Sequence, residues 1–163
     1  MSNDLVPRRT LGTALRHLLE LLDGDVHAVY REEGLDYRPR YTPLMRALAQ
    51  SGPLTIKALA AAAGISHSAA SQTVAKMRAA GLVTDAQAAD GRERTVRLSR
   101  RGSGLLPRLR ERWTATNTAA EQLDRELSQR LSACVEEAIA ALEAKPFKER
   151  IRAVEQRARR RKS

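Results

Sequence analysis

The sequence predicts a mainly α-helical protein that carries one small β-hairpin. Alanine, leucine and arginine, which lose little side-chain freedom in a helix, are abundant, while aromatic residues make up only 3% of the chain. Apolar residues recur at helical spacing in two long stretches, near residues 10–33 and 100–144. Between these stretches lie short helical segments, followed by two short segments that alternate as paired strands do.

Residues 10–33 form the first predicted helix. Its apolar residues recur three or four positions apart, so they form one stripe along the helix. The stripe consists of Leu11, Leu15, Leu18, Leu22, Val26 and Val29. Gly34 is expected to end this helix, residues 35–42 to form a linker, and residues 44–50 to form a short helix that starts behind Pro43.

A pair of short helices is predicted next. Thr55 is suited to cap a helix through Ala63, and Gly64 can take the left-handed conformation that commonly follows a helix. Ser66 then caps a second helix, which Gly81 ends. Two helices joined by such a tight turn form a helix-turn-helix. The contacts expected to hold the pair together come from Leu59, Ala60, Val74 and Met77.

A β-hairpin is predicted directly after this pair. Residues 82–84 and 95–98 read as short strands, and Asp90-Gly91 between them is a typical turn sequence. A hairpin in this place is the wing of a winged helix-turn-helix lobe, which we assign to residues 43–99.

The C-terminal part is predicted to be helical. Residues 100–144 carry two apolar stripes, the first with heptad-like spacing and with Pro107 expected to bend the helix near its start. Lys145-Pro146 should close the second helix, and a basic extension, residues 145–163, follows. Helical spacing of its apolar residues predicts a further helix through Val154, with an unstructured tip.

The charge of the chain points to a polyanionic partner. The formal net charge is +10, but residues 145–163 hold nine Lys/Arg against two Glu, so the rest of the chain carries only +3. Residues 64–101 hold seven Lys/Arg against three Asp/Glu. The helix-turn-helix and wing are therefore basic without the extension, which favours double-stranded DNA as the partner.

The second helix of a helix-turn-helix enters the major groove and reads base edges with its N-terminal residues. Gln72 can pair bidentately with adenine, while Lys76 and Arg78 are placed for phosphates, and Arg92 and Arg94 at the hairpin can reach the minor groove or a phosphate. The predicted DNA contacts from these elements are Ser66, His67, Ser68, Ser71, Gln72, Lys76, Arg78, Arg92 and Arg94.

Several function classes find no support in the sequence. The single cysteine, Cys134, excludes an internal disulfide and is interpreted as structural, since no cation beside it in sequence would lower its pKa. The three histidines lack partners at metal-ligand spacing, so no metal and no cofactor are expected. No nucleophile–base set or phosphate loop emerges, and no long apolar run or signal peptide is present. We therefore expect a cytoplasmic protein that is not an enzyme.

The lobe resembles the MarR family of bacterial transcriptional regulators. The resemblance is carried by the run LAAAAGISHSAASQTVAKMRAAGLV, by Asp90-Gly91-Arg92 and by VRLSRRG with Gly102, and it covers roughly residues 10–144. The chain departs from the family pattern at Ala70 and Thr73, where larger aliphatic residues are usual, and in its basic extension.

The resemblance implies a homodimer in which residues 10–33 and 100–144 of two chains interleave. It also implies that Asp90 orients Arg92, and that the protein is a repressor of a palindromic operator, released by a small aromatic or anionic effector. The effector site is expected where the dimer helices meet the lobe. Its candidate residues are His17, His27, Tyr30, Tyr37, Arg40, Tyr41 and Trp113.

Each of these interpretations has an alternative. The helix pair could be a purely structural element of an all-α domain, although the wing and the local basic charge would then be coincidental. The apolar stripes of residues 10–33 and 100–144 could form a monomer core, although so much apolar surface favours a dimer. The aromatic residues could simply pack the junction. The basic extension could be solvated, add phosphate contacts or add a helix to the dimer. An architectural protein that coats DNA without sequence preference or effector response is the alternative function.

Overall fold

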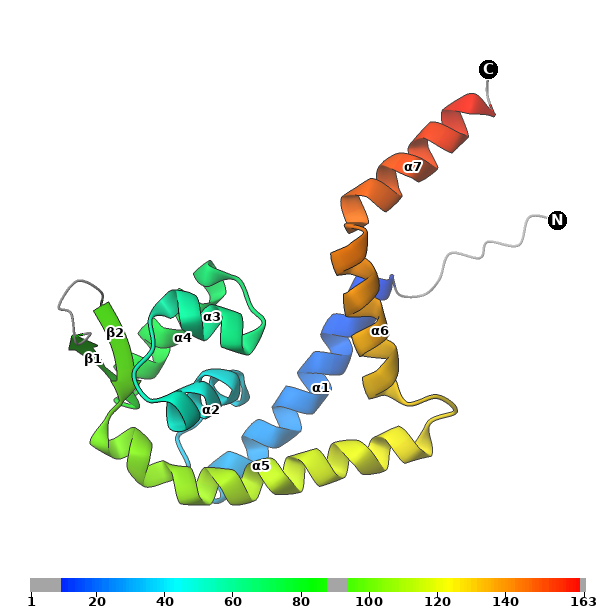
Figure 1. Cartoon of the computed structure of the whole chain (residues 1–163). Helices are drawn as coiled ribbons and strands as arrows, with labels where there is room; N and C mark the ends of the chain where they lie inside the picture. Colours follow the sequence, from blue (N-terminus) through cyan, green and yellow to red (C-terminus); the bar gives the residue numbers. More distant parts are fainter. Residues whose placement is uncertain (1–9, 88–93, 162–163) are drawn as a thin grey trace. The chain divides into compact units, whose positions relative to one another are not determined.

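The computed structural model of the chain describes residues 10–87 and 94–161. Two compact units make up the chain, residues 1–111 and 112–163, and helix α5 (Arg100–Glu126) runs through both. Helices dominate each unit, and the described strands form one two-stranded antiparallel sheet (Figure 1). The predicted class, mainly α with a small β-hairpin, is confirmed.

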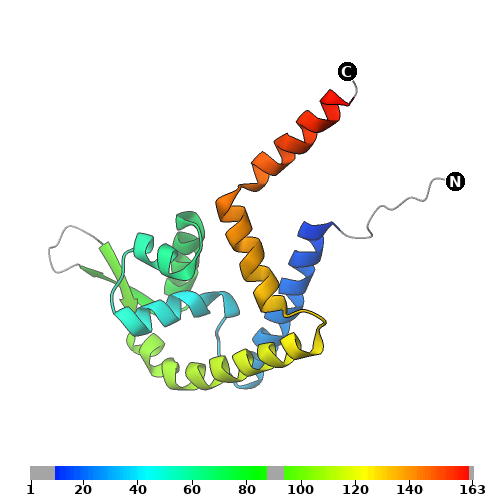
Figure 2. The same ribbon diagram turned by 45° about the vertical axis from the view of Figure 1, so that its right-hand side comes forward.

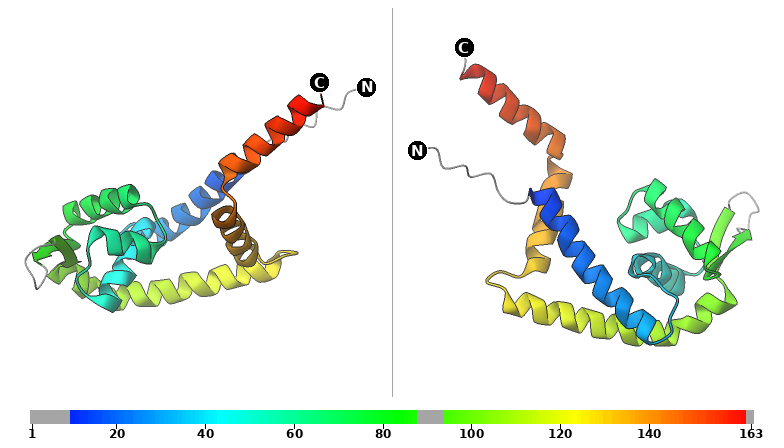
Figure 3. Two further views of the ribbon diagram at one scale, coloured as in Figure 1. Left: turned by 45° about the horizontal axis from the view of Figure 1, so that its top comes forward. Right: turned by 180° about the vertical axis from the view of Figure 1, so that it is seen from behind.

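Helix α1 (Leu11–Glu32) begins at Thr10, whose hydroxyl accepts a hydrogen bond from the Thr13 amide at 3.2 Å. Gly34 follows its C-terminal end with a φ of +67°. The helix extends away from the lobe that α2–α4 and the strands build within the same unit (Figure 3). Its large apolar side chains therefore stay exposed, namely those of Leu11, Leu15, Leu19, Leu21, Leu22 and Val29.

The linker after α1 brings three tyrosine rings together. It contains a short 3₁₀ helix, η1 (Pro39–Tyr41), which leads directly into α2 (Thr42–Ser51). The rings of Tyr30 and Tyr37 pack edge to face at 5.1 Å, and those of Tyr37 and Tyr41 do so at 5.8 Å. This geometry suits the quadrupoles of aromatic rings. All three rings are buried, so they form part of the core of the first unit.

Helices α3 (Ile56–Ala63) and α4 (His67–Ala79) form the predicted helix-turn-helix (Figure 2). The hydroxyls of Thr55 and Ser66 cap the two helices, and Gly64 between them has a φ of +63°. This left-handed conformation strains any residue with a Cβ atom, so the tight turn depends on glycine. The expected contact residues Leu59, Ala60, Val74 and Met77 are all buried.

Strands β1 (Val83–Gln87) and β2 (Arg94–Leu98) pair with Val83 opposite Leu98. They are longer than predicted, because the ladder continues to Gln87 opposite Arg94. Leu54, just before α3, adds a bridge to Val96 with hydrogen bonds of 3.0 and 2.8 Å. The hairpin is thereby tied to the N-terminal side of the helix pair.

The start of α5 packs closely on the loop that precedes β1. The Ser99 hydroxyl donates to the Gly81 carbonyl at 2.6 Å and accepts from the Gly102 amide at 2.9 Å. A Cβ atom on Gly102 would lie 2.1 Å from the Leu82 carbonyl oxygen. Only glycine permits this approach, which explains the residue in the VRLSRRG motif. Helix α5 continues through Pro107 as one element.

In the second unit, the end of α5 is joined to α6 (Leu131–Ala144) by a carboxylate. Asp124 is buried, and it accepts hydrogen bonds from the amide of Ser132, at 3.1 Å, and from its hydroxyl. These hydrogen bonds, led by the one from the Ser132 hydroxyl, lower the pKa of Asp124. The carboxylate thus caps α6, since Arg130 at the N-cap position makes no side-chain capping bond.

Helix α7 (Phe147–Arg160) follows α6 after Lys145 and Pro146. It continues well past Val154, where the sequence interpretation ended it. The added turns contain Arg157, Arg159 and Arg160, and cationic side chains near a helix C-terminus interact favourably with the helix dipole.

Candidate functional site

Helix α4 has a core face and an opposite, solvent-exposed face. Ala70, Val74 and Met77, which recur at helical spacing, are buried against the rest of the lobe. The methyl group of Ala70 is fully buried, so a small residue fills this position of the helix pair. Most of the predicted contact residues of α4 are exposed, as the side chains of Ser66, His67, Ser68, Gln72, Lys76 and Arg78 show. Ser71 is half-buried.

The exposed face carries hydrogen-bonding groups over its first two turns. Ser68 and Gln72 are four residues apart and share one side of α4, away from the core face. Lys76 follows one turn later. A helix held from behind by apolar contacts, with an exposed amide and an exposed cation in front, is equipped to enter a nucleic-acid groove.

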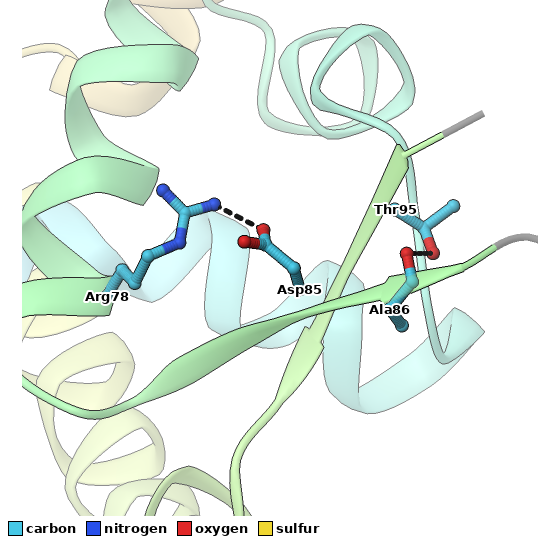
Figure 4. A network of polar contacts seen from close by, with 4 residues as sticks. All are labelled: Arg78, Asp85, Ala86 and Thr95. Carbon is cyan, nitrogen blue, oxygen red and sulfur yellow. Dashed lines mark hydrogen bonds and ion pairs between the residues drawn. The ribbon is translucent and has the colours of Figure 1, made fainter.

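Arg78 has a partner that the sequence interpretation missed. Its guanidinium donates to the Asp85 carboxylate at 2.6 Å and so links α4 to β1 (Figure 4). The side chains of Arg78 and Asp85 are 43% and 65% exposed, and solvent-exposed ion pairs contribute little stability. The pair therefore orients the guanidinium at the edge of the hairpin, where a phosphate can still compete for it.

The described part of the hairpin is braced by a second contact. The Thr95 hydroxyl donates to the Ala86 carbonyl at 2.9 Å, which adds a side-chain bond beside the ladder (Figure 4). Arg94 opens β2 and is exposed. Asp90 and Arg92, predicted to act together at the tip, lie outside the described residues.

The predicted effector residues are distributed over several places. Tyr30, Tyr37 and Tyr41 are buried against each other, and the Tyr37 hydroxyl donates to Thr42 at 3.2 Å. Trp113 is also buried and belongs to the second unit. His17 faces Glu20 at 3.9 Å on the outer part of α1, and Arg40 is exposed.

The surface has a hollow of about 470 Å³ at the C-terminal end of α1. Of the predicted effector residues only His27 lines it, and the other lining residues are Arg31, Gly34, Leu35, Asp36 and Arg38. The Nδ1 atom of His27 is buried and has no hydrogen-bond partner among the described residues. The cationic side chains of Arg31 and Arg38 among the lining residues make this hollow suited to an anion.

Sequence reasoning overlooked Arg31 and Arg38. The signal for Arg31 was available, since it lies four residues after His27 and therefore on the same side of α1. Asp36, the acidic residue of the hollow, is paired with Arg101 at 3.7 Å. That pairing leaves the local balance of charge positive.

Other kinds of site find no support in the described ranges. Residues 10–87 and 94–161 contain no group of three His, Cys, Asp or Glu side chains that could hold a metal ion. Within those ranges, no helix has the length and apolarity needed to cross a bilayer. Cys134 is exposed on α6, with its thiol 3.6 Å from the Gln129 side-chain oxygen.

The sequence profile of the MarR family matches residues 34–93, from the end of α1 to the hairpin. Comparison with curated proteins gives no match. Solved structures of similar fold cover most of the chain. A MarR family transcriptional regulator from Silicibacter pomeroyi is 25% identical, with a TM-score of 0.53 over 82% of this chain and 93% of its own.

Two further solved structures were determined with bound partners. MosR, a transcriptional regulator of Mycobacterium tuberculosis in complex with DNA, is 19% identical, with a TM-score of 0.66 over 85% of this chain and 100% of its own. The transcriptional regulator PcaV of Streptomyces coelicolor, in complex with its natural ligand, is 18% identical, with a TM-score of 0.60 over 89% and 98%.

Proposed function

We propose that this chain is a MarR-family transcriptional regulator and, more specifically, a sequence-specific DNA-binding repressor that acts as a cytoplasmic homodimer. The observation that carries the proposal is helix α4. Its core face is fully used by the lobe, whereas its opposite face presents Ser68, Gln72 and Lys76 to solvent. The lobe is also basic, as DNA binding requires.

In this proposal α4 lies in the major groove. Gln72 reads a base edge, and Lys76 contacts the phosphate backbone. Arg78 and Arg94 flank the hairpin and add backbone contacts, with Asp85 orienting Arg78. Asp90 and Arg92 at the hairpin tip complete the wing, as the family resemblance implies.

The homodimer is proposed because both long terminal elements expose apolar stripes. Helix α1 leaves six large apolar side chains exposed, and α6 exposes Val135, Ile139 and Leu142. Exposed apolar surface on this scale marks an interaction site. A two-fold dimer would carry two α4 helices, which have to reach successive major grooves about 34–36 Å apart. The operator is therefore expected to be palindromic.

The test compares Gln72→Ala with Lys76→Ala, an exposed neighbour on the same helix. Operator and scrambled duplexes are titrated at the same salt concentration. Gln72→Ala should reduce the difference in binding free energy between the operator and the scrambled duplex by about 1–3 kcal/mol, because a bidentate base contact is lost. Lys76→Ala should weaken binding to both duplexes alike, and it should reduce the slope of log affinity against log salt concentration by about 1.

A contrary result has a clear meaning. If the wild-type protein binds operator and random DNA equally, it is the architectural protein of the alternative function. If Gln72→Ala leaves the ratio unchanged while the wild type is specific, α4 does not lie in the groove as proposed.

We further propose an effector site in the hollow at the end of α1, for a small aromatic or other organic anion. Arg31 and Arg38 supply positive charge, and the imidazole of His27 is a further side chain of the lining. The buried tyrosines adjoin the lining residues in sequence, since Tyr30 precedes Arg31 and Tyr37 lies between Asp36 and Arg38. A site on the segment that joins α1 to the lobe can couple ligand binding to lobe position.

Calorimetric titration with a panel of aromatic carboxylates tests this site. Arg31→Gln and Arg38→Gln should weaken binding, while Arg40→Gln, an exposed arginine of the same linker that does not line the hollow, should not. A ligand that lowers operator affinity tenfold requires about 1.4 kcal/mol of coupling, and operator DNA must then weaken the ligand equally. Equal loss in all three variants would remove the assignment to this hollow.

A further inference from the structure

Helix α7 is amphipathic and has an unpartnered apolar stripe. Phe147, Ile151, Val154 and Ala158 recur at alternating steps of four and three residues, so they share one side of the helix. The first three are 60%, 47% and 66% exposed. The remaining surface is strongly basic, with six Lys/Arg against two Glu between Phe147 and Arg160.

The connection between α6 and α7 keeps the apolar stripe of α7 away from α6 of the same chain. Arg150 donates to the carbonyl of Ala141 at 2.8 Å and to that of Lys145 at 3.3 Å, so it caps the C-terminal end of α6. With only Lys145 and Pro146 between the helices, α7 continues beyond α6 instead of folding back along it (Figures 1 and 2). Neither helix has a buried residue.

Helix α6 is complementary to α7 in charge. It contains Glu136, Glu137 and Glu143 and no Lys or Arg. Its apolar residues Val135, Ile139 and Leu142 are 39%, 45% and 43% exposed. Glu136 and Glu143 are seven residues apart and border Ile139, which lies between them at helical spacing. The apolar stripe of α6 is thus bordered by acidic residues, whereas that of α7 is bordered by basic ones, so the two surfaces are complementary.

We propose that α7 docks on α6 of the partner subunit and so forms a second, charge-complementary layer of the dimer interface. The inference rests on the proposed homodimer. Two-fold symmetry makes the contact occur twice, once for each α7. Because the acidic helix is part of the same assembly, its effective concentration around α7 is high, of the order of mM for short connections. Anionic lipid or DNA would have to compete with that local partner, and neither requires α6 to be acidic.

The experiment uses two full-length variants with reversed charges at exposed positions. The first is Glu136→Lys with Glu143→Lys on α6. The second is Arg157→Glu with Arg161→Glu on the side of α7 nearest Val154. Each variant alone places like charges across both copies of the contact, whereas a mixed dimer of the two pairs opposite charges in both copies.

Equimolar mixing followed by native mass spectrometry measures the proportion of mixed dimers. We expect the equilibrium constant for exchange of the two homodimers into mixed dimers to exceed its statistical value by at least about tenfold. The reason is that like charges facing each other across an interface are costly. The preference should shrink as salt rises. Unchanged helical circular dichroism verifies that the variants fold, and Phe147→Ser, which alters the stripe without changing charge, should raise the dimer dissociation constant.

A matched control is Arg152→Glu with Arg160→Glu, which changes charge equally on the far side of α7. Mixed with the α6 variant, it should give the statistical proportion. If the α7 variant gives that proportion too, the proposal is overturned. Loss of binding to phosphatidylglycerol vesicles or to random duplex would then assign α7 to lipid or to DNA. A wild-type monomer at micromolar concentration would instead refute the proposed homodimer itself.

Discussion

Replacing Gly102 by alanine tests how the lobe is joined to α5. The new Cβ atom would lie 2.1 Å from the Leu82 carbonyl oxygen and 3.1 Å from its carbonyl carbon. Since close C···O contacts lie at about 3.3–3.6 Å, the backbone has to shift by roughly 1 Å. The same carbonyl accepts a hydrogen bond from the Ser99 amide at 3.0 Å, so the shift disturbs the cap of α5.

The expected cost follows from these contacts. Overpacking costs about 1–3 kcal/mol, and each weakened hydrogen bond adds about 0.5–1.5 kcal/mol. The higher helix propensity of alanine offsets at most about 1 kcal/mol of this destabilisation. We therefore expect Gly102→Ala to lower the free energy of unfolding by about 2–3 kcal/mol.

Gly104→Ala is the matched control, because it is in the same helix and its Cβ atom would meet nothing within 4 Å. It should stabilise the protein by about 0.5–1 kcal/mol. The assay is urea unfolding followed by circular dichroism, at one protein concentration because association adds to apparent stability. If Gly102→Ala is as stable as Gly104→Ala, the close approach to Leu82 does not exist.

Two further predictions concern the second unit. Asp124→Asn should destabilise the corner between α5 and α6 at neutral pH, and the difference from wild type should shrink as pH falls. The pKa of Asp124 is lower in the folded protein than its unfolded value of about 3.9, so the carboxylate contributes stability above that pH and loses it as pH falls through the folded pKa. If acid-unfolding measurements show the same stability difference between variant and wild type at every pH, the pairing with Ser132 is contradicted. Removal of residues 147–163 should raise the dimer dissociation constant in analytical ultracentrifugation and leave the salt slope of operator binding nearly unchanged, whereas a slope shallower by about 0.9 per lost phosphate contact would place α7 on DNA.

Local signals predicted the helix-turn-helix well. The caps at Thr55 and Ser66 and the left-handed turn at Gly64 depend on atoms within a few residues of one another. Such interactions are readable from a single stretch of chain. The exposure of most α4 contact residues followed from the same periodicity that placed Val74 and Met77 in the core.

Contacts between distant residues were not predictable in this way. Arg78 was interpreted only as a phosphate contact, because nothing local indicates that the hairpin places Asp85 beside it. The bridge between Leu54 and Val96 likewise joins residues that are far apart in sequence.

The sequence alone determined the element types, the order of the elements and the basic character of the lobe, because these depend on local propensity and on composition. Only the tertiary structure decided that the tyrosines near residue 37 pack against each other while His27, Arg31 and Arg38 line a hollow. Periodicity assigns a residue to one side of its own helix. What that side meets depends on how separate segments pack, and packing is set by the summed contacts of the whole unit.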